Sequence, residues 1–195
     1  MVIVIRIKVP KRVERAIVWL AEAYYRRRLG CDIRVITLSR FKFAIVDKDD
    51  FERLKPYRWF SLWNRCGYYA VRNVRRCERR RLQIMMHREI VGAPKGVLVD
   101  HINGNTLDNR KANLRLATAS QNMYNTRRNK KGCASGFRGV SWHKHAKKWE
   151  ARLASEGKRI YAGSYDSELE AAKAYDTAAR KYHKEFARLN FPSES

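Results

Sequence analysis

The 195-residue sequence predicts an α+β fold in which short strands and hairpins alternate with short helices. Three observations lead to this prediction. Extended runs with alternating apolar and polar residues recur in the first half, a strand–loop–strand–helix order occupies the middle, and three short strands before one amphipathic helix close the chain. No apolar run approaches the roughly 20 residues that a membrane span needs, so we expect no membrane partner.

The first predicted element is a helix at residues 11–29, within an N-terminal extension of residues 1–35. Apolar residues recur there at helical spacing, and basic residues followed by Gly30 are typical of a helix end. The expected apolar stripe consists of Val13, Ala16, Ile17, Leu20 and Tyr24.

Residues 36–82 are predicted to form basic β-hairpins. The extended pattern of residues 34–46 precedes a short helix that begins after Asp47 and ends before Pro56. Residues 59–64 and 67–74 alternate as a hairpin, and a second hairpin loop is expected between residues 74 and 82. That segment carries a cluster of arginines that repel one another, so we expect it to contact phosphates. The cluster comprises Arg72, Arg75, Arg76, Arg79, Arg80 and Arg81.

Residues 83–128 have the order helix, strand, loop, strand, helix. Residues 85–91 begin as a helix that Gly92 ends, and residues 97–99 form a strand that delivers Asp100 and His101 at its end. The Asn103-Gly104 pair indicates a turn, and residues 114–116 return as the second strand. Thr118 and Gln121 make a capping box that opens a helix through about residue 127. Asn122 therefore lies in the first turn of that helix.

A linker is expected at residues 129–136, followed by a small domain at residues 137–192. Its strands are predicted at residues 137–143, 147–154 and 158–162. Ser167 and Glu170 make a second capping box, which opens a helix with the apolar stripe Ala172, Tyr175, Ala179 and Tyr182. We therefore expect a three-stranded antiparallel sheet packed on one helix.

The charge indicates a polyanionic partner. The formal net charge is +24, and residues 1–99 hold 24 basic and 9 acidic side chains against 12 and 8 in residues 135–195. The cysteines Cys31, Cys66, Cys77 and Cys133 form no C-x-x-C pair, which favours free thiols in a reducing compartment. A disulfide or shared metal between Cys66 and Cys77 stays an alternative. No signal peptide is visible, and we expect a cytoplasmic protein of a bacterial or phage-infected cell.

The middle segment strongly resembles HNH homing endonucleases of the phage and intron-encoded type. The resemblance rests on Val99-Asp100-His101-Ile102-Asn103-Gly104-Asn105, Asn109-Arg110, Asn113-Leu114 and Ser120-Gln121-Asn122. It implies a ββα-metal nuclease core, with His101 as general base and Asp100 and Asn122 as metal ligands. It also implies that Asn113 ties the loop between the strands and steadies His101. His87 and Arg88 stand where relatives place a His-Arg pair, so they are possible accessory residues.

The residue types suit phosphodiester hydrolysis. An imidazole with an ordinary pKa of about 6.5 deprotonates water at physiological pH. A hard ion such as Mg²⁺ prefers oxygen ligands and stabilises the leaving oxyanion, and Asp100 and Asn122 offer a carboxylate and an amide oxygen. We therefore expect Mg²⁺ or Mn²⁺, with one ion per active site.

Residues 135–192 look like the plant ethylene-response-factor (APETALA) DNA-binding domain. The resemblance rests on Ser135-Gly136-Phe137-Arg138-Gly139-Val140, Trp149-Glu150-Ala151-Arg152-Leu153 and Leu189-Asn190-Phe191-Pro192, among other segments. It implies a sheet that enters the major groove of DNA. The expected contacts are Arg138, Trp142, Lys144, Arg152, Arg159 and Tyr161. Ser141, His143 and Ala154 stand where the plant factors usually have arginine, so we expect a different or looser sequence preference.

These observations predict a site-directed, metal-dependent DNA endonuclease of a mobile element. Its partner is double-stranded DNA, which a monomer nicks or cuts, with no small-molecule substrate. The alternative is a non-catalytic DNA-binding regulator with an inactive HNH scaffold. A ribonuclease is disfavoured because a major-groove sheet does not enter the deep, narrow groove of A-form RNA.

Overall fold

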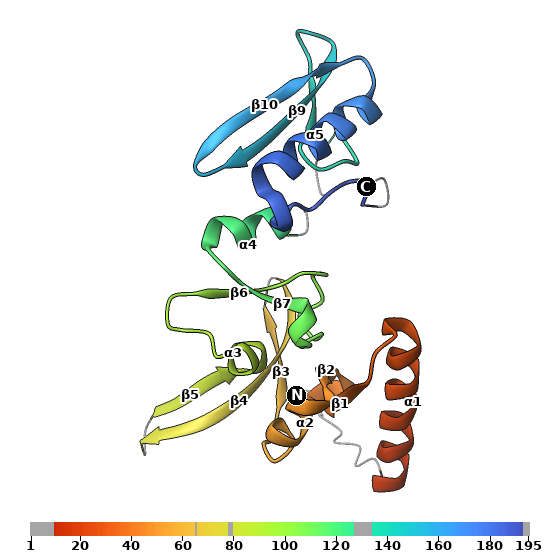
Figure 1. Ribbon diagram of the computed structural model, residues 1–195, viewed down its shortest axis with the longest axis vertical. Coiled ribbons are helices and arrows are strands. Elements are labelled where there is room, and N and C mark those ends of the chain that lie inside the picture. Colours follow the sequence, from red (N-terminus) through yellow and green to blue (C-terminus); the bar gives the residue numbers. More distant parts are fainter. Residues whose placement is uncertain (1–9, 65, 78–79, 127–133, 193–195) are drawn as a thin grey trace, which may run out of the picture. The chain divides into compact units, whose positions relative to one another are not determined.

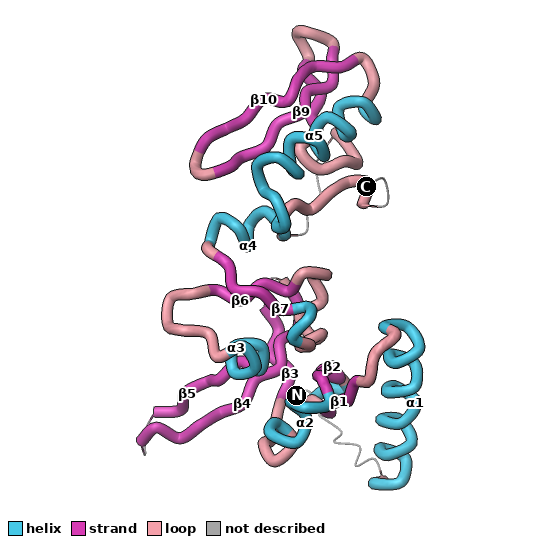
Figure 2. Tube along the Cα trace, viewed as in Figure 1, coloured by secondary structure: helices cyan, strands magenta, loops and turns pink. Residues whose placement is uncertain are grey.

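The computed structural model describes residues 10–64, 66–77, 80–126 and 134–192 as short helices and four small sheets (Figures 1 and 2). The predicted α+β class is confirmed. The chain divides into two compact units, each discontinuous in sequence: Met1–Ala93 with Asn105–Arg115, and Pro94–Gly104 with Leu116–Ser195. The domain boundaries expected from the sequence stay predictions. Among the described helices, none is long and apolar enough to cross a membrane.

The first unit contains two antiparallel sheets, β1-β2 and β3-β4-β5. Its elements are α1 (Lys11–Leu29), β1 (Ile33–Thr37), β2 (Phe43–Asp47), α2 (Lys48–Leu54), β3 (Phe60–Asn64), β4 (Gly67–Cys77), β5 (Arg80–Met85) and α3 (Met86–Val91). The predicted helices and the first predicted hairpin of this half are confirmed. In that hairpin β3 pairs with β4, and Asn64 and Gly67 are the last paired residues before the turn.

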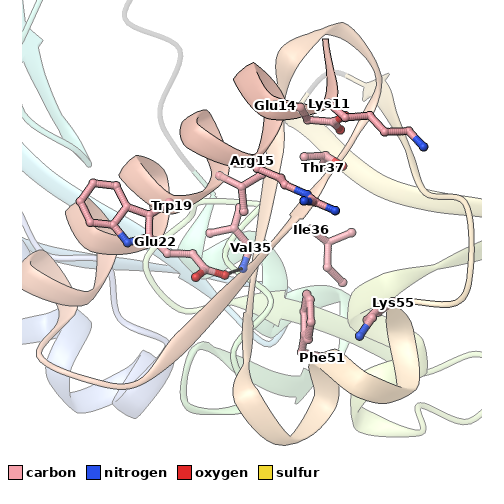
Figure 3. A pocket seen from close by; sticks show the side chains of 11 residues that line it. Lys11, Glu14, Arg15, Trp19, Glu22, Val35, Ile36, Thr37, Phe51 and Lys55 are labelled. Atoms are coloured by element: carbon pink, nitrogen blue, oxygen red, sulfur yellow. Dashed lines mark hydrogen bonds between the residues drawn. The ribbon is translucent and has the colours of Figure 1, made fainter. Parts of the chain in front are cut away.

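The helix α1 packs on β1 with a different face from the one expected. Ala21, Tyr25 and Leu29 contact the buried cluster of Ile33, Val35 and Ile45, whereas the predicted stripe is largely exposed. Polar contacts fix this rotation, because the carboxylate of Glu22 accepts from the Val35 amide at 3.1 Å (Figure 3). The prediction of the packing face was therefore wrong.

The second hairpin extends through the arginine cluster. Arg75 pairs with Arg81 and Cys77 pairs with Arg80, so β4 and β5 continue where a loop was expected. The loop prediction was wrong because the backbone pairing of β4 with β5 does not end with the alternating apolar residues but continues through the arginines that follow them. Arg72 is bound within the protein: it donates to both carboxylate oxygens of Glu89 at 2.9 and 3.2 Å. The side chains of residues 76–81 lie outside the described part.

The second unit contains the strand that carries Asp100 and His101, and the C-terminal module, by which we mean residues 134–192. Its elements are β6 (Leu98–His101), α4 (Ala119–Asn125), β8 (Val140–His143), β9 (Lys148–Ser155), β10 (Lys158–Tyr165) and α5 (Glu168–His183). β6 pairs with β7 (Leu114–Ala117), on which the chain passes from the first unit to the second. Most of the predicted linker, residues 127–133, lies outside the described residues.

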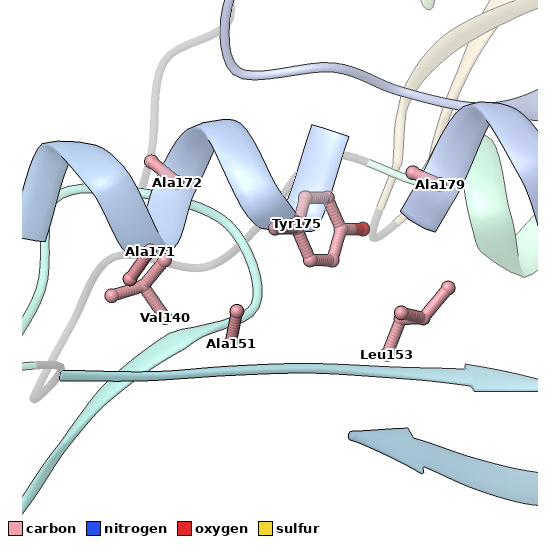
Figure 4. Packing of buried hydrophobic residues seen from close by; sticks show 7 residues of the cluster. All are labelled: Val140, Ala151, Leu153, Ala171, Ala172, Tyr175 and Ala179. Carbon is pink, nitrogen blue, oxygen red and sulfur yellow. The ribbon is translucent and has the colours of Figure 1, made fainter. Parts of the chain in front are cut away.

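The core of the C-terminal module lies between α5 and the sheet β10-β9-β8 (Figure 4). Ala172, Tyr175 and Ala179 are buried as predicted. Tyr182, which was predicted to belong to the same stripe, is exposed, and the neighbouring His183 is buried. The Ser167 side chain caps the amide of Leu169 at 3.2 Å, in place of the predicted bond to residue 170. Ala172, Tyr175, Ala179 and His183 are three or four residues apart and so share the buried face of α5, which Tyr182 does not join.

Candidate functional site

Asp100 and His101 lie at the end of β6 and are both buried, with 6% and 4% of their surface exposed. Neighbouring residues of a regular strand point to opposite faces. β6 ends at His101, whose carbonyl accepts from the Gly104 amide at 2.8 Å in a turn. The structure therefore places both residues where the strand gives way to the loop.

Asn125, on α4, is the main contact that sequence reasoning missed. Its amide Nδ2 lies 3.0 Å from each carboxylate oxygen of Asp100 and 2.9 Å from the carbonyl oxygen of His101. Asn125 is 7% exposed, so these bonds are shielded from water. The available signal was its spacing: it follows Asn122 by three residues, and such residues share one face of a helix.

The helix α4 begins as the sequence predicts. The Thr118 side chain accepts from the Gln121 amide at 3.2 Å, and the Gln121 side chain accepts from the Thr118 amide at 2.8 Å. This capping box fixes the first turn, which carries Asn122. Asn122 is half-buried and lies on the α4 face that holds Asp100 through Asn125.

Asn113 ties together the loop between the two strands. Its Nδ2 donates to the carbonyl of Asp108 at 2.7 Å. The same loop is joined to β2, because the Ile45 amide donates to Leu107 at 2.9 Å and the Asn109 amide donates to Ile45 at 2.8 Å. Asn113 is therefore part of an anchored loop, and its effect on His101 stays a prediction.

The accessory pair belongs to α3. His87 is buried, and its ring lies 5.5 Å from that of Tyr69. Arg88 donates to the carbonyl of Ala93 at 3.3 Å, near the C-terminal end of the helix. Both contacts lie within the first unit, and a role for either residue in catalysis or phosphate contact stays a prediction.

Three of the expected DNA contacts share one face of the C-terminal sheet. Tyr161 pairs with Arg152 across the strands, and Arg159 pairs with Ala154 two positions further on. This face is opposite to Leu153, which packs under α5. Arg152 is also bound to Glu150. The sheet thus presents one aromatic and two basic side chains to solvent.

Trp142, Lys144 and Arg75 have different surroundings. Trp142 is 40% exposed and packs edge-on against Trp149 at 5.1 Å, which places it at the margin of the core. Lys144 is exposed in the turn after β8, and Arg75 is exposed on β4. The remaining predicted phosphate contacts, Arg76, Arg79, Arg80 and Arg81, have side chains outside the described part.

Arg138 has its guanidinium turned toward the protein. It donates to the hydroxyl of Tyr175 at 2.8 Å and to the carbonyls of Tyr124 at 3.0 Å, Met123 at 3.4 Å and Thr126. Burial raises the pKa of the Tyr175 hydroxyl, and the charge of Arg138 offsets part of that rise. Residues 123–126 belong to α4 and its end, so Arg138 joins the C-terminal module to the helix that carries Asn122 and Asn125.

Two thiols and one groove belong to the first unit. Cys31 and Cys66 are free and exposed. A groove between α1 and β1 is lined by Trp19, Glu22, Ile36 and Phe51 among others, and by none of the predicted site residues (Figure 3). Within the described ranges, no group of three or more His, Cys, Asp or Glu side chains gathers as a metal cluster.

Comparison with known proteins finds family models that match two segments of the chain. A family model described as HNH endonuclease matches residues 81–124, and one described as AP2 domain matches residues 135–185. An uncharacterised HNH endonuclease of Acanthamoeba polyphaga mimivirus is 30% identical over 152 residues, which cover 76% of this chain and 74% of the relative. Protein 3.8 of Escherichia phage T7 is 39% identical over 96 residues, covering 49% of this chain and 78% of the relative.

The C-terminal module has plant relatives. An AP2-like ethylene-responsive transcription factor of Arabidopsis thaliana is 36% identical over 72 residues, which cover 37% of this chain and 15% of the relative. The chain therefore shares only a small part of that factor's length. Both expected resemblances are confirmed.

Proposed function

Because the chain belongs to the HNH endonuclease family, we propose that it hydrolyses phosphodiester bonds of double-stranded DNA with the help of a divalent cation. The observation that carries the proposal is the buried pair Asp100 and His101 at the end of β6, held by Asn125 of α4. Two consecutive buried residues thus supply an imidazole, a potential base, and a carboxylate, a potential ligand for a hard cation.

His101 is the general base in this proposal. It takes the proton from the water that attacks the phosphorus, and the hydrogen bond from Asn125 to its carbonyl holds the backbone in place. Asn113 acts on the loop between the strands through its bond to Asp108, which keeps that loop in shape. The placement of the base strongly affects the cleavage rate, because the imidazole must lie within hydrogen-bond distance of the attacking water to take its proton.

Asp100 and Asn122 would hold the cation, which is Mg²⁺ or Mn²⁺ with one ion per site. When bound, the ion supplies positive charge for the leaving 3′ oxygen. The donor set fits: a carboxylate and an amide oxygen are hard ligands. Asn125 Nδ2 lies within hydrogen-bond distance of both carboxylate oxygens of Asp100, and an ionised carboxylate can accept from, or bind, more than one partner at a time.

Two surfaces would hold the duplex. In this proposal the β4–β5 hairpin binds phosphates through the arginines of the cluster other than Arg72, which is paired with Glu89. The exposed sheet face with Arg152, Arg159 and Tyr161 enters the major groove. The match to an AP2 domain supports the second surface. We further propose a homing role in a mobile element, within a bacterial or phage-infected cell; a relative encoded by a phage is in keeping with this.

A non-catalytic DNA-binding regulator is the second candidate function, and the plant transcription factor relatives favour it. The presence of both Asp100 and His101 at the end of β6 favours the nuclease over this alternative, because these are the side-chain types that the hydrolysis needs.

The decisive experiment incubates the full chain with a supercoiled plasmid library of randomised inserts at low salt. We expect nicked or linear plasmid with Mg²⁺ and none with a chelator. A protein that binds the library and cuts no member of it, with Mg²⁺ or Mn²⁺, would establish the regulator instead.

A further inference from the structure

The C-terminal end of α4 is capped by side chains of the C-terminal module. The last carbonyls of a helix have no partner within the helix and need donors from elsewhere. Arg138 donates to the carbonyls of Met123, Tyr124 and Thr126, and Arg188 donates to the carbonyl of Asn125 at 3.1 Å. Four successive carbonyls therefore accept from two guanidinium groups, whose positive charge also suits a helix C-terminus.

The side of α4 packs on the same module. The Tyr124 ring stacks on the His183 ring with centroids 3.8 Å apart and an interplanar angle of 8°. The Tyr124 hydroxyl accepts from the Glu156 amide at 3.0 Å, and Phe186 completes a buried cluster with Tyr124 and Ala117. The helix is thus fixed in position along its side and at its end, which restricts both rotation and sliding.

The opposite side of the same turn touches the candidate nuclease site. Asn125 offers its carbonyl to Arg188 and its amide to Asp100. A single residue therefore links the C-terminal module to the carboxylate at the end of β6. Shifting the end of α4 by the length of one hydrogen bond would remove the donor from Asp100.

We propose that Arg138 and Arg188 are positioning residues of the nuclease: they fix α4, and through Asn125 they set the Asp100 carboxylate. The inference rests on the proposed function, and it gives the C-terminal module a structural role in addition to DNA binding. It also replaces DNA contact as the role of Arg138, because that guanidinium is committed to the carbonyls of α4 and to Tyr175.

The test uses the full chain with Arg138→Lys, Arg138→Met and Arg188→Met, and with Arg159→Met as the matched control on the exposed sheet face. A lysine keeps the positive charge but has no planar fork that reaches several carbonyls. Three quantities are measured. They are the affinity for DNA in the presence of a metal chelator, the affinity for Mn²⁺ by electron spin resonance, and the rate of amide hydrogen exchange in α4. Mn²⁺ affinity and exchange are measured without DNA cleavage, so they stay informative even if the plasmid assay fails.

We expect all three variants at Arg138 and Arg188 to keep DNA affinity within about two-fold, since neither residue touches DNA. They should speed exchange in α4 and weaken Mn²⁺ binding by about 10-fold or more, the usual effect of removing a residue that supports a metal ligand. Arg159→Met should do the reverse, with weaker DNA binding and unchanged α4 exchange.

The opposite pattern overturns the proposal. If Arg138→Met weakens DNA binding while α4 exchange and Mn²⁺ affinity stay at wild-type values, Arg138 is a DNA contact. If Arg138→Met does not fold, Arg138→Lys and Arg188→Met carry the test, because each leaves part of the capping in place.

Discussion

Asn125 is the residue whose contacts best explain the geometry of the site. Its amide reaches both Asp100 oxygens and the carbonyls of His101 and Ile102. A buried carboxylate is costly unless it accepts hydrogen bonds. The bonds from Asn125 therefore both stabilise Asp100 in its buried position and orient it.

We predict that Asn125→Ala lowers stability and cleavage together. Removing the donor from a buried carboxylate costs about 1–3 kcal/mol, and cleavage should fall about 10- to 100-fold. Urea unfolding and single-turnover cleavage measure the two effects. Asn122→Ala is the control: we expect weaker Mn²⁺ binding and near wild-type stability, because Asn122 is only half-buried. If Asn125→Ala and Asn122→Ala lost the same amount of stability, the separate roles assigned to Asn125, which supports Asp100, and Asn122, which binds the ion, would be contradicted.

A second prediction at the residue scale concerns Gly139. It has a positive φ of 71°, and a Cβ there would overlap the ring of Tyr175 and approach the carbonyl of Arg152. Gly139→Ala should destabilise the C-terminal module by about 1–3 kcal/mol from overpacking, with further strain from the left-handed backbone. Gly157→Ala is the control, since its φ is 76° and a Cβ there meets open space. Similar melting temperatures for the two variants would refute the packing argument.

At the scale of the element, the stack of Tyr124 on His183 joins α4 to α5. His183 donates from Nε2 to the carbonyl of Ala154 at 2.9 Å, and its buried Nδ1 has no hydrogen-bond partner among the described residues. Burial lowers the pKa of His183, and the charge of Arg138 lowers it further. The lowered pKa favours the neutral imidazole over the charged form in the folded protein.

This lowered pKa predicts a loss of stability in acid. The unfolded chain, with an ordinary histidine pKa of about 6.5, binds more protons than the folded one below that pH. The His183 contribution is therefore intact above about pH 6.5 and decreases as the pH falls below it. Unfolding free energy measured between pH 7.5 and 5 should fall less steeply in His183→Phe, which keeps the stack. In His145→Gln, which alters an exposed residue, the slope should match wild type. An unchanged slope in His183→Phe would contradict the assignment.

Local patterns made some elements predictable, and long-range contacts made others unpredictable. The capping box of Thr118 and Gln121 depends on residues three apart, so the start of α4 was evident from the sequence. The packing face of α1 depends on the bond from Val35 to Glu22, thirteen residues away, and no local period indicates it. The same applies to Arg138, whose partners on α4 lie 12 to 15 residues earlier in the chain. Asp100 and His101 could be predicted as site residues from a local motif. The contacts of Asn125 with them span 24 to 25 residues and became evident only in the folded structure.

At the scale of the whole molecule, the basic charge is unevenly distributed. Residues 1–99 hold 24 basic and 9 acidic side chains, and residues 135–195 hold 12 and 8. In the C-terminal module, two of the arginines donate to carbonyls at the end of α4, and in our proposal they add little to phosphate binding. Bulk affinity for the phosphate backbone should therefore come mainly from the N-terminal half.

Salt dependence tests this division. Replacing Arg75, Arg76, Arg80 and Arg81 by Gln should reduce the slope of log affinity against log salt by about 0.9 for each phosphate that is no longer neutralised. Replacing Arg152 and Arg159 should change the slope less and the sequence preference more. Point substitutions are preferable to a deletion of residues 135–195, because the deletion would also remove Arg138 and Arg188, which cap α4. If replacing Arg152 and Arg159 changed the salt slope more than replacing the hairpin arginines, the C-terminal module would be the main source of phosphate affinity, contrary to our prediction.

The most direct test of the account is single-turnover DNA cleavage by wild type and His101→Ala, with DNA affinity measured on the same samples and His145→Ala as the control. If His101 is the base of the site built on β6 and α4, His101→Ala keeps wild-type affinity and cleaves about 100-fold more slowly or not at all. His145→Ala should match wild type in both. Cleavage by His101→Ala at the wild-type rate, or a loss of cleavage that only follows a loss of binding, would contradict the account.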